Sequence, residues 1–128
     1  MAYDILMVDD SRTTKAVIAK SLGLSGLPLG ALRDAGNGRE GLEILRKDHV
    51  DLVFADLNMP VMGGMEMVAQ MKADEALRAI PVVVISTEGS EARIQELRAS
   101  GVAAFLRKPF RPEMLKQVVE EILGVNRG

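Results

Sequence analysis

The sequence predicts an α/β fold, a doubly wound sheet of five parallel strands within a three-layer α/β/α sandwich. First, short apolar runs alternate five times with segments whose apolar residues recur at helical spacing. Second, the runs are apolar at consecutive positions, as expected of strands buried on both faces of a parallel sheet. Third, five such units in 128 residues average about 26 residues each, near the size of a βα unit. Right-handed crossovers then place helices on both faces of the sheet.

The elements of the first third have clear local signals. Residues 5–8 are wholly apolar and are followed by two aspartates, which predicts a buried strand. Apolar residues recur at helical spacing over 12–24, which predicts a helix. A loop with three glycines and a proline is expected over 23–30. A weaker strand is expected over 29–35, where charged residues interrupt the apolar run.

The next elements repeat this alternation. Asn37 is expected to cap the second helix because Glu40, three residues on, completes a capping pair. Residues 52–55 predict a third strand that ends at Asp56, and residues 58–64 predict a loop. The helix that follows is expected to carry on one face Met65, Val68 and Met71.

Two further strand–helix units complete the chain. Residues 82–85 are β-branched throughout and give the clearest strand signal. A mostly polar helix is expected next, ending near Gly101, followed by a short last strand over 103–106. The last helix is expected to begin at Pro112, because proline is favoured at the first helical position. No linker or change of composition divides the sequence, so a single domain is expected over residues 1–128.

Composition excludes several classes of protein. The absence of cysteine excludes disulfides, thiolate metal sites and cysteine nucleophiles, and the single histidine disfavours a Ser-His-Asp triad. With 16 basic against 18 acidic residues and 3% aromatic residues, DNA binding is disfavoured. No segment approaches the roughly 20 apolar residues of a membrane helix, and the first residues carry no secretory signal. A soluble cytoplasmic protein without membrane insertion is therefore expected.

Candidate chemical residues stand where the predicted strands end: Asp9, Asp10, Asp56, Ser86 and Lys108. In doubly wound folds, function gathers at this edge of the sheet. If the first and third strands are neighbours, the three carboxylates meet and repel one another unless a cation such as Mg²⁺ is present. The lysine and the hydroxyl would add a positive charge and a donor. Together these groups suit the transfer of a phosphoryl group to a carboxylate.

Each of these residues also has a structural interpretation when it is considered alone. Asp9, Asp10 and Ser11 can cap the first helix, and Ser86 can cap a later one. Asp56 can simply end a strand, and a single lysine is usually a solvated surface charge.

Three other features are interpreted as structural. Residues 36–41 match G-x-G-x-x-G, but a whole strand–helix unit precedes this dinucleotide-binding pattern. Turn chemistry and close helix packing at Gly41 are therefore favoured over a cofactor site. A methionine-rich segment over 59–71 is interpreted as core filling rather than an adaptable binding surface. His49 is interpreted as interacting with a helix dipole.

Four motifs, each at a predicted strand end, resemble those of the receiver domains of two-component response regulators. They are Asp9-Asp10, Asp56-Leu57-Asn58-Met59-Pro60, Ser86-Thr87-Glu88 and Lys108-Pro109-Phe110. The resemblance covers essentially the whole chain and is closest to the stand-alone chemotaxis regulators of that family. It implies a flavodoxin-like fold and a role in chemotaxis signalling. It also implies a phosphoacceptor that a sensor histidine kinase phosphorylates and that loses its own phosphate, rather than a turnover enzyme.

The resemblance implies roles for the residues of the metal and phosphate site. Asp56 would accept the phosphoryl group. Mg²⁺ would be bound by Asp10, Asp56 and the backbone carbonyl of Asn58, with Asp9 assisting through water. Asn58 and Glu88 would tune how quickly water removes the phosphate.

The resemblance also implies a switch. Ser86 and Lys108 would contact the phosphoryl group, with a cis bond before Pro109 fixing the direction of the lysine. Phe105, at the position of the switch aromatic, would then move inward. A downstream protein would bind the face formed by the fourth helix, the last strand and the last helix, around Arg93, Arg98, Phe105, Arg107 and Lys116.

Two departures and several alternatives accompany this interpretation. Phe105 replaces the tyrosine of the chemotaxis regulators and offers no hydroxyl, and the loop over 23–30 is longer than expected. The alternatives are a receiver domain cut from a longer regulator, with residues 125–128 beginning a linker, a phosphate sink or relay, and a small Mg²⁺-dependent aspartyl phosphatase. A flavodoxin-like electron carrier is disfavoured because Asp9 and Asp10 would repel its phosphate. A monomer or weak dimer is expected.

Overall fold

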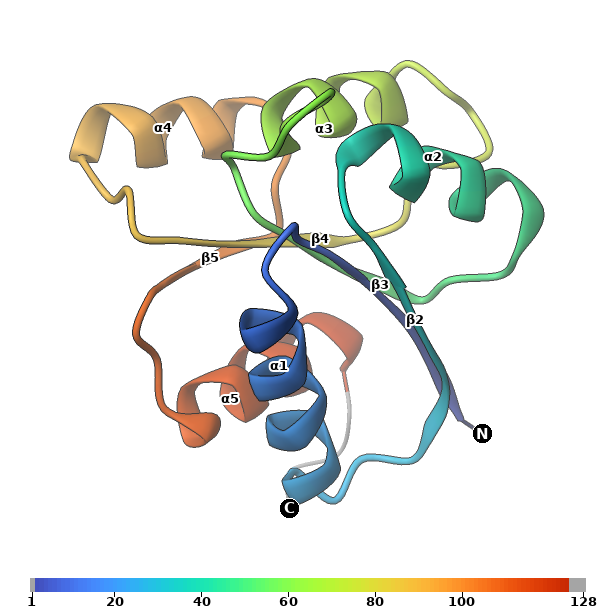
Figure 1. The fold of residues 1–128 in the computed structure, drawn as a ribbon, viewed down its shortest axis with the longest axis vertical. Coiled ribbons are helices and arrows are strands. Elements are labelled where there is room, and N and C mark those ends of the chain that lie inside the picture. The colour runs from blue at the N-terminus through green and yellow to red at the C-terminus, as the bar shows by residue number, and fades with distance from the viewer. Residues whose placement is uncertain (1, 125–128) are drawn as a thin grey trace.

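The computed structural model describes residues 2–124 and forms one sheet of five parallel strands in the order β2-β1-β3-β4-β5. The strands are β1 (Tyr3–Val8), β2 (Leu29–Ala35), β3 (Leu52–Ala55), β4 (Val82–Ser86) and β5 (Ala104–Arg107). The helices are α1 (Arg12–Leu24), α2 (Gly38–Lys47), α3 (Gly64–Lys72), α4 (Glu91–Ala99) and α5 (Pro112–Leu123). Helices α1 and α5 cover one face of the sheet and α2, α3 and α4 the other (Figure 1). The predicted doubly wound three-layer sandwich is confirmed.

Strand residues alternate between two cores, which explains why the strands are apolar at every position. On β3, Leu52 and Phe54 pack in the core shared with α1 and α5, while Val53 and Ala55 pack in the core shared with α2, α3 and α4. All four side chains are almost completely buried. The central strand therefore contributes to both layers, and Asp56 directly follows its last buried residue.

The first loop is shorter than predicted. Helix α1 continues through Gly23 to Leu24, and β2 already begins at Leu29, so the connection occupies only residues 25–28. Ser25 ends the helix, because its backbone N–H donates to the carbonyl of Leu22 while its Oγ accepts from Leu27 N at 3.2 Å. The predicted loop over 23–30 was therefore wrong at both ends.

The methionine-rich segment fills the core, as predicted, but the buried face of α3 differs from the predicted one. Met67 and Met71 are fully buried in the core with α2 and α4, whereas Met65 is only half-buried at its margin. The buried residues Gly64, Met67, Val68 and Met71 follow helical spacing, and Met65 lies one position away from that stripe. Strand β5 is likewise shifted by one residue from its predicted range.

Local contacts support the structural interpretation of the G-x-G-x-x-G segment. The Asn37 side chain accepts from Glu40 N at 3.0 Å, and the Glu40 carboxylate accepts from Gly36 N at 3.0 Å, which forms the predicted capping pair. A Cβ at Gly41 would lie 3.0 Å from Val8 Cγ2 and 3.1 Å from Met67 Sδ, so this glycine allows α2 to pack closely. The segment is a capped helix start.

Three remaining expectations concern the helix end, the membrane and the chain end. His49 lies beyond the end of α2 and pairs with Asp51 through Nε2 and Oδ1 at 2.8 Å, so its partner is a carboxylate rather than the helix dipole. Within residues 2–124, no helix combines the length and apolar character that crossing a membrane requires. Residues 125–128, proposed as a linker start, lie outside the described residues.

Candidate functional site

Three carboxylates converge where β1 and β3 end. The two strands are neighbours, and Asp56 N donates to the carbonyl of Val8 at 3.0 Å. One carboxylate oxygen from each of Asp9, Asp10 and Asp56 lies within 4.8 Å of the others. The convergence expected from neighbouring first and third strands is therefore present.

The two adjacent aspartates have different surroundings. Asp9 is 2% exposed, its Oδ1 accepts from Ser11 N at 2.8 Å, and its Oδ2 lies 3.3 Å from Lys108 Nζ. Asp10 is exposed. The cap of α1 is Ser11, whose Oγ accepts from Thr14 N at 3.2 Å. The capping interpretation is therefore correct for Ser11. The carboxylate of Asp10 does not provide the cap of α1.

Lys108 belongs to the carboxylate cluster. Its Nζ lies 3.3 Å from Asp9 Oδ2 and 3.5 Å from Asp56 Oδ2, and its side chain is only 20% exposed. The surface-charge interpretation is therefore wrong. Lys108 follows β5, and its backbone N–H donates to the carbonyl of Ser86 at 2.9 Å. The peptide bond between Lys108 and Pro109 is cis.

Burial raises the pKa of Asp56 above its ordinary value of 3.8, and the nearby Asp9 carboxylate raises it further. The Lys108 ammonium and the backbone N–H groups of Leu57 and Asn58 oppose this rise of the pKa. Negative charge at Asp56 is therefore only partly balanced by the protein's own groups. A divalent cation with hard oxygen ligands would supply the missing positive charge.

The raised pKa predicts how Asp56 affects stability without metal. The folded state binds the Asp56 proton more tightly than the unfolded chain, so stability falls as pH rises from 3.8 through the raised pKa. Asp56→Asn lacks this fall. The free energy of unfolding of Asp56→Asn minus that of the wild type should therefore increase across this interval and stay constant above it. Urea unfolding in EDTA over a pH series measures this difference, and a pH-independent difference would contradict the prediction.

Ser86 lies beside the cluster as the last residue of β4 and is 1% exposed. Its Oγ accepts from Glu88 N at 3.2 Å. It does not cap α4, because Ser90 does so by accepting from Arg93 N at 3.2 Å. The structural interpretation of Ser86 as a helix cap is therefore wrong, and its hydroxyl serves the β4–α4 connection instead.

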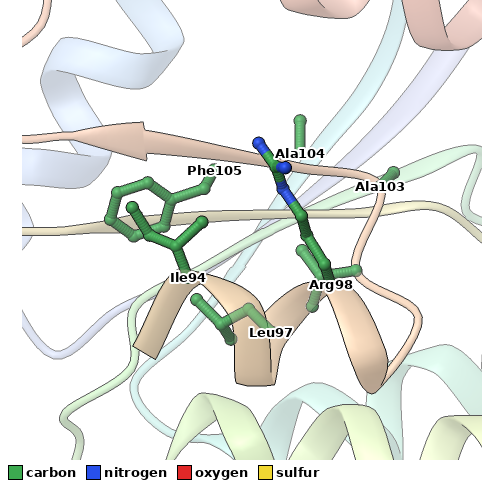
Figure 2. Close-up of a pocket in the computed structure, with 7 residues that line it drawn as sticks. Ile94, Leu97, Arg98, Ala103, Ala104 and Phe105 are labelled. Atoms are coloured by element: carbon green, nitrogen blue, oxygen red, sulfur yellow. The ribbon is translucent and has the colours of Figure 1, made fainter. Parts of the chain in front are cut away.

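Phe105 is half-buried on β5 and lines a cavity of about 420 Å³ between α4 and β5. Its ring lies beside Ile94 of α4, and Arg98 extends from the same helix toward Ala104 (Figure 2). This cavity lies on the face expected to bind a downstream protein.

Sequence reasoning missed two glycines that shape the β3–α3 loop. Gly64 N donates to the carbonyl of Leu57 at 3.1 Å. A Cβ at Gly63 would lie 2.5 Å from the carbonyl oxygen of Leu57. A Cβ at Gly64 would collide with the carbonyl oxygen of Asp56. Only glycine allows α3 to start against the backbone that carries Asp56. The adjacent glycines immediately before an apolar helix were the available signal. Asn58 is exposed within the same loop.

Comparisons with known proteins agree with this geometry. The response regulator receiver domain family matches residues 5–120. A chemotaxis protein CheY homologue from Campylobacter jejuni is 33% identical over 125 residues, which cover 97% of this chain and 95% of the relative. Chemotaxis protein CheY1 of Helicobacter pylori is 35% identical over 123 residues, covering 95% and 98%. The solved structure of CheY4, a chemotaxis response regulator of Vibrio cholerae, has a TM-score of 0.84 at 31% identity, covering 95% of this chain and 99% of that one.

The parallel five-stranded sheet carries three acidic side chains and a lysine at its carboxyl edge, the arrangement that the resemblance to receiver domains implied. The chain belongs to the response regulator receiver domain family. Within this family, it is a receiver domain of the CheY type, which confirms the resemblance found in the sequence.

Proposed function

We propose that a histidine kinase transfers a phosphoryl group to Asp56 and that the phosphorylated protein signals by changing a protein-binding face. The observation that carries the proposal is the convergence of three carboxylates and Lys108 at one strand edge. In the transfer, a carboxylate oxygen of Asp56 attacks the phosphorus atom. The phosphorus–nitrogen bond to the kinase histidine breaks, and the imidazole leaves with its electron pair.

The donor set fits Mg²⁺. Asp10 and Asp56 offer hard carboxylate oxygens that lie within 4.8 Å of each other. The backbone carbonyl of Asn58 would be a third ligand, and Asp9 would assist through water. When bound, the ion would neutralise negative charge on the transferring phosphoryl oxygens. Lys108 already lies 3.5 Å from Asp56 Oδ2 and would pair with a phosphoryl oxygen once that carboxylate has become an acyl phosphate.

Phosphorylation of Asp56 would change the protein-binding face through residues of β4 and β5. Ser86 would donate its hydroxyl hydrogen to a phosphoryl oxygen, and Phe105 would move inward into the space that this change opens. The cavity beside Ile94 and Phe105 would change shape, and with it the α4–β5–α5 face. Asn58 and Glu88 would tune the attack of water that ends the signal.

The similarity to known proteins indicates the signalling pathway in which the protein would act. The similarity to CheY proteins supports a role in chemotaxis, with phosphoryl donation and output both in the cytoplasm. Signalling would require a downstream protein that binds the α4–β5–α5 face. The protein would be a phosphoacceptor that loses its own phosphate rather than an enzyme that turns over many substrates.

Ser86→Ala should uncouple the output face while Asp56 is still phosphorylated. One hydrogen bond to a charged group contributes about 1.5–3 kcal/mol. The equilibrium constant for conversion of the phosphorylated protein to its active state should therefore fall roughly 10–100-fold. NMR spectra with and without beryllium fluoride, a phosphoryl mimic, should show shifts at Phe105 in the wild type but not in Ser86→Ala. Mass measurement after acetyl phosphate treatment should show one added phosphoryl group in both proteins.

Thr87→Ala is the matched control for Ser86→Ala, because it removes a neighbouring hydroxyl that is exposed. It should behave as the wild type in both measurements. If wild-type shifts stay within the carboxylate cluster and never reach Phe105, the proposed output is wrong. The protein would then be a phosphate sink or relay.

A further inference from the structure

A chain of contacts links the buried hydroxyl of Ser86 to helix α4. Ser86 Oγ accepts from Glu88 N at 3.2 Å, and the Glu88 carboxylate accepts from Arg93 Nε at 2.6 Å. Arg93 Nη1 also lies 3.7 Å from Glu96 Oε1, one turn further along the helix. The β4–α4 connection is therefore tied at one end to the strand and at the other to the first turns of α4.

Movement of Ser86 would disturb this chain. When Ser86 Oγ moves to a phosphoryl oxygen on Asp56, the acceptor of the Glu88 N–H moves away. A partly buried N–H needs another acceptor, so the segment around Glu88 has to rearrange. The ion pair between Glu88 and Arg93 resists that rearrangement, because it attaches the side chain of Glu88 to helix α4. An interaction made in only one of two states shifts the equilibrium toward that state.

We propose that Arg93 is a positioning residue that acts through Glu88 and holds the β4–α4 connection in its unphosphorylated conformation. This inference rests on the proposed function, because it concerns the response to a phosphoryl group on Asp56. Loss of the arginine therefore makes the phosphoryl-bound state easier to reach, and the protein binds a phosphoryl mimic more tightly. By the reciprocity of linkage, a partner that engages Arg93 and releases Glu88 has the same effect.

The size of the effect follows from the exposure of the pair. The two side chains are 36% and 38% exposed, so solvent screens their attraction. Measured couplings of such exposed pairs correspond to about a 1.5- to 5-fold change in an equilibrium constant. The difference between wild type and Arg93→Gln should shrink as salt concentration rises, because the wild-type pair is then screened.

The test measures the affinity for beryllium fluoride at saturating Mg²⁺ by NMR titration. Arg93→Gln should bind about 1.5- to 5-fold more tightly than the wild type, with unchanged Mg²⁺ affinity. In a Glu88→Gln background, Arg93→Gln should have no further effect, since its partner is already neutral. Arg93→Lys keeps the positive charge and should retain most of the wild-type behaviour.

Two control variants separate the pair from general effects of charge. Arg39→Gln removes an arginine from another exposed Arg–Glu pair, with Glu43 on α2, and should leave the affinity unchanged. Glu96→Gln removes only the second contact of Arg93 and should also leave it unchanged. Equal affinities of wild type and Arg93→Gln, or equal effects of Arg93→Gln with and without Glu88, overturn the inference alone. No binding of beryllium fluoride by the wild type overturns the proposed function as well.

Discussion

Asp56→Asn should abolish phosphorylation by acetyl phosphate, whereas the wild type should gain a single phosphoryl group in the presence of Mg²⁺. The surroundings of Asp56 and Asp9 distinguish these two carboxylates. Both oxygens of Asp9 are already engaged, by Ser11 N and by Lys108, and the side chain is buried. Asp56 Oδ1 accepts from Leu57 N at 2.8 Å, whereas Oδ2 lies 3.5 Å from Lys108 Nζ, a longer contact than the 3.3 Å hydrogen bond to Asp9, and is the more available nucleophile. Intact-mass measurement detects the product directly.

A matched control for Asp56→Asn is Asp34→Asn, which neutralises an exposed aspartate on β2 that pairs with Lys15 at 3.6 Å. Asp34→Asn should be phosphorylated as the wild type is. Equal modification of the wild type and Asp56→Asn would show that another residue accepts the phosphoryl group, and would contradict the assignment.

Asp10→Ala should weaken Mg²⁺ binding more than the roughly 10–100-fold that loss of an outer-shell partner costs, because a ligand itself is removed. Metal-free stability should hold or rise, since one of three mutually repelling carboxylates is gone. The cap of α1 stays intact in this variant because Ser11 provides it. Isothermal titration with Mg²⁺ and urea unfolding in EDTA measure the two effects.

Glu75→Ala serves as the control for Asp10→Ala, because it removes the same charge from an exposed position in the turn after α3. Its Mg²⁺ affinity should match that of the wild type. A metal-free loss of about 1 kcal/mol in Asp10→Ala, the usual size of a lost helix cap, would show that Asp10 has a structural role. Unchanged Mg²⁺ affinity would remove Asp10 from the ligand set.

Much of the fold could be predicted because its signals are local. Residues 52–55 are apolar at every position, and only a strand covered on both faces buries all of them. The Asn37–Glu40 pair marked the start of α2 for a similar reason, since a cap is made within four residues of sequence. The helical spacing over 12–24 correctly placed the end of α1 at Leu24, but the loop was expected to begin too early because Gly23 resembles a loop residue. The connection begins at Ser25, whose hydroxyl accepts from Leu27 N.

The candidate site was partly predictable in the same way. Asp9, Asp56, Ser86 and Lys108 stand at strand ends, and parallel strands bring their carboxyl ends to one edge. Residue types and spacing alone could not exclude that Lys108 was a solvated charge. That question depends on the distance between groups separated by about a hundred residues, which only the packed strands determine.

The sequence by itself therefore determined the elements, the layers and the edge at which polar groups gather, because hydrophobic periodicity and capping act over a few residues. Tertiary structure alone decided which donor contacts each carboxylate oxygen. It placed Lys108 between Asp9 and Asp56, buried Asp56 enough to raise its pKa, and joined Glu88 to Arg93. Charge interactions and desolvation depend on distances and burial in three dimensions, and these exist only after the sheet and its helices have packed.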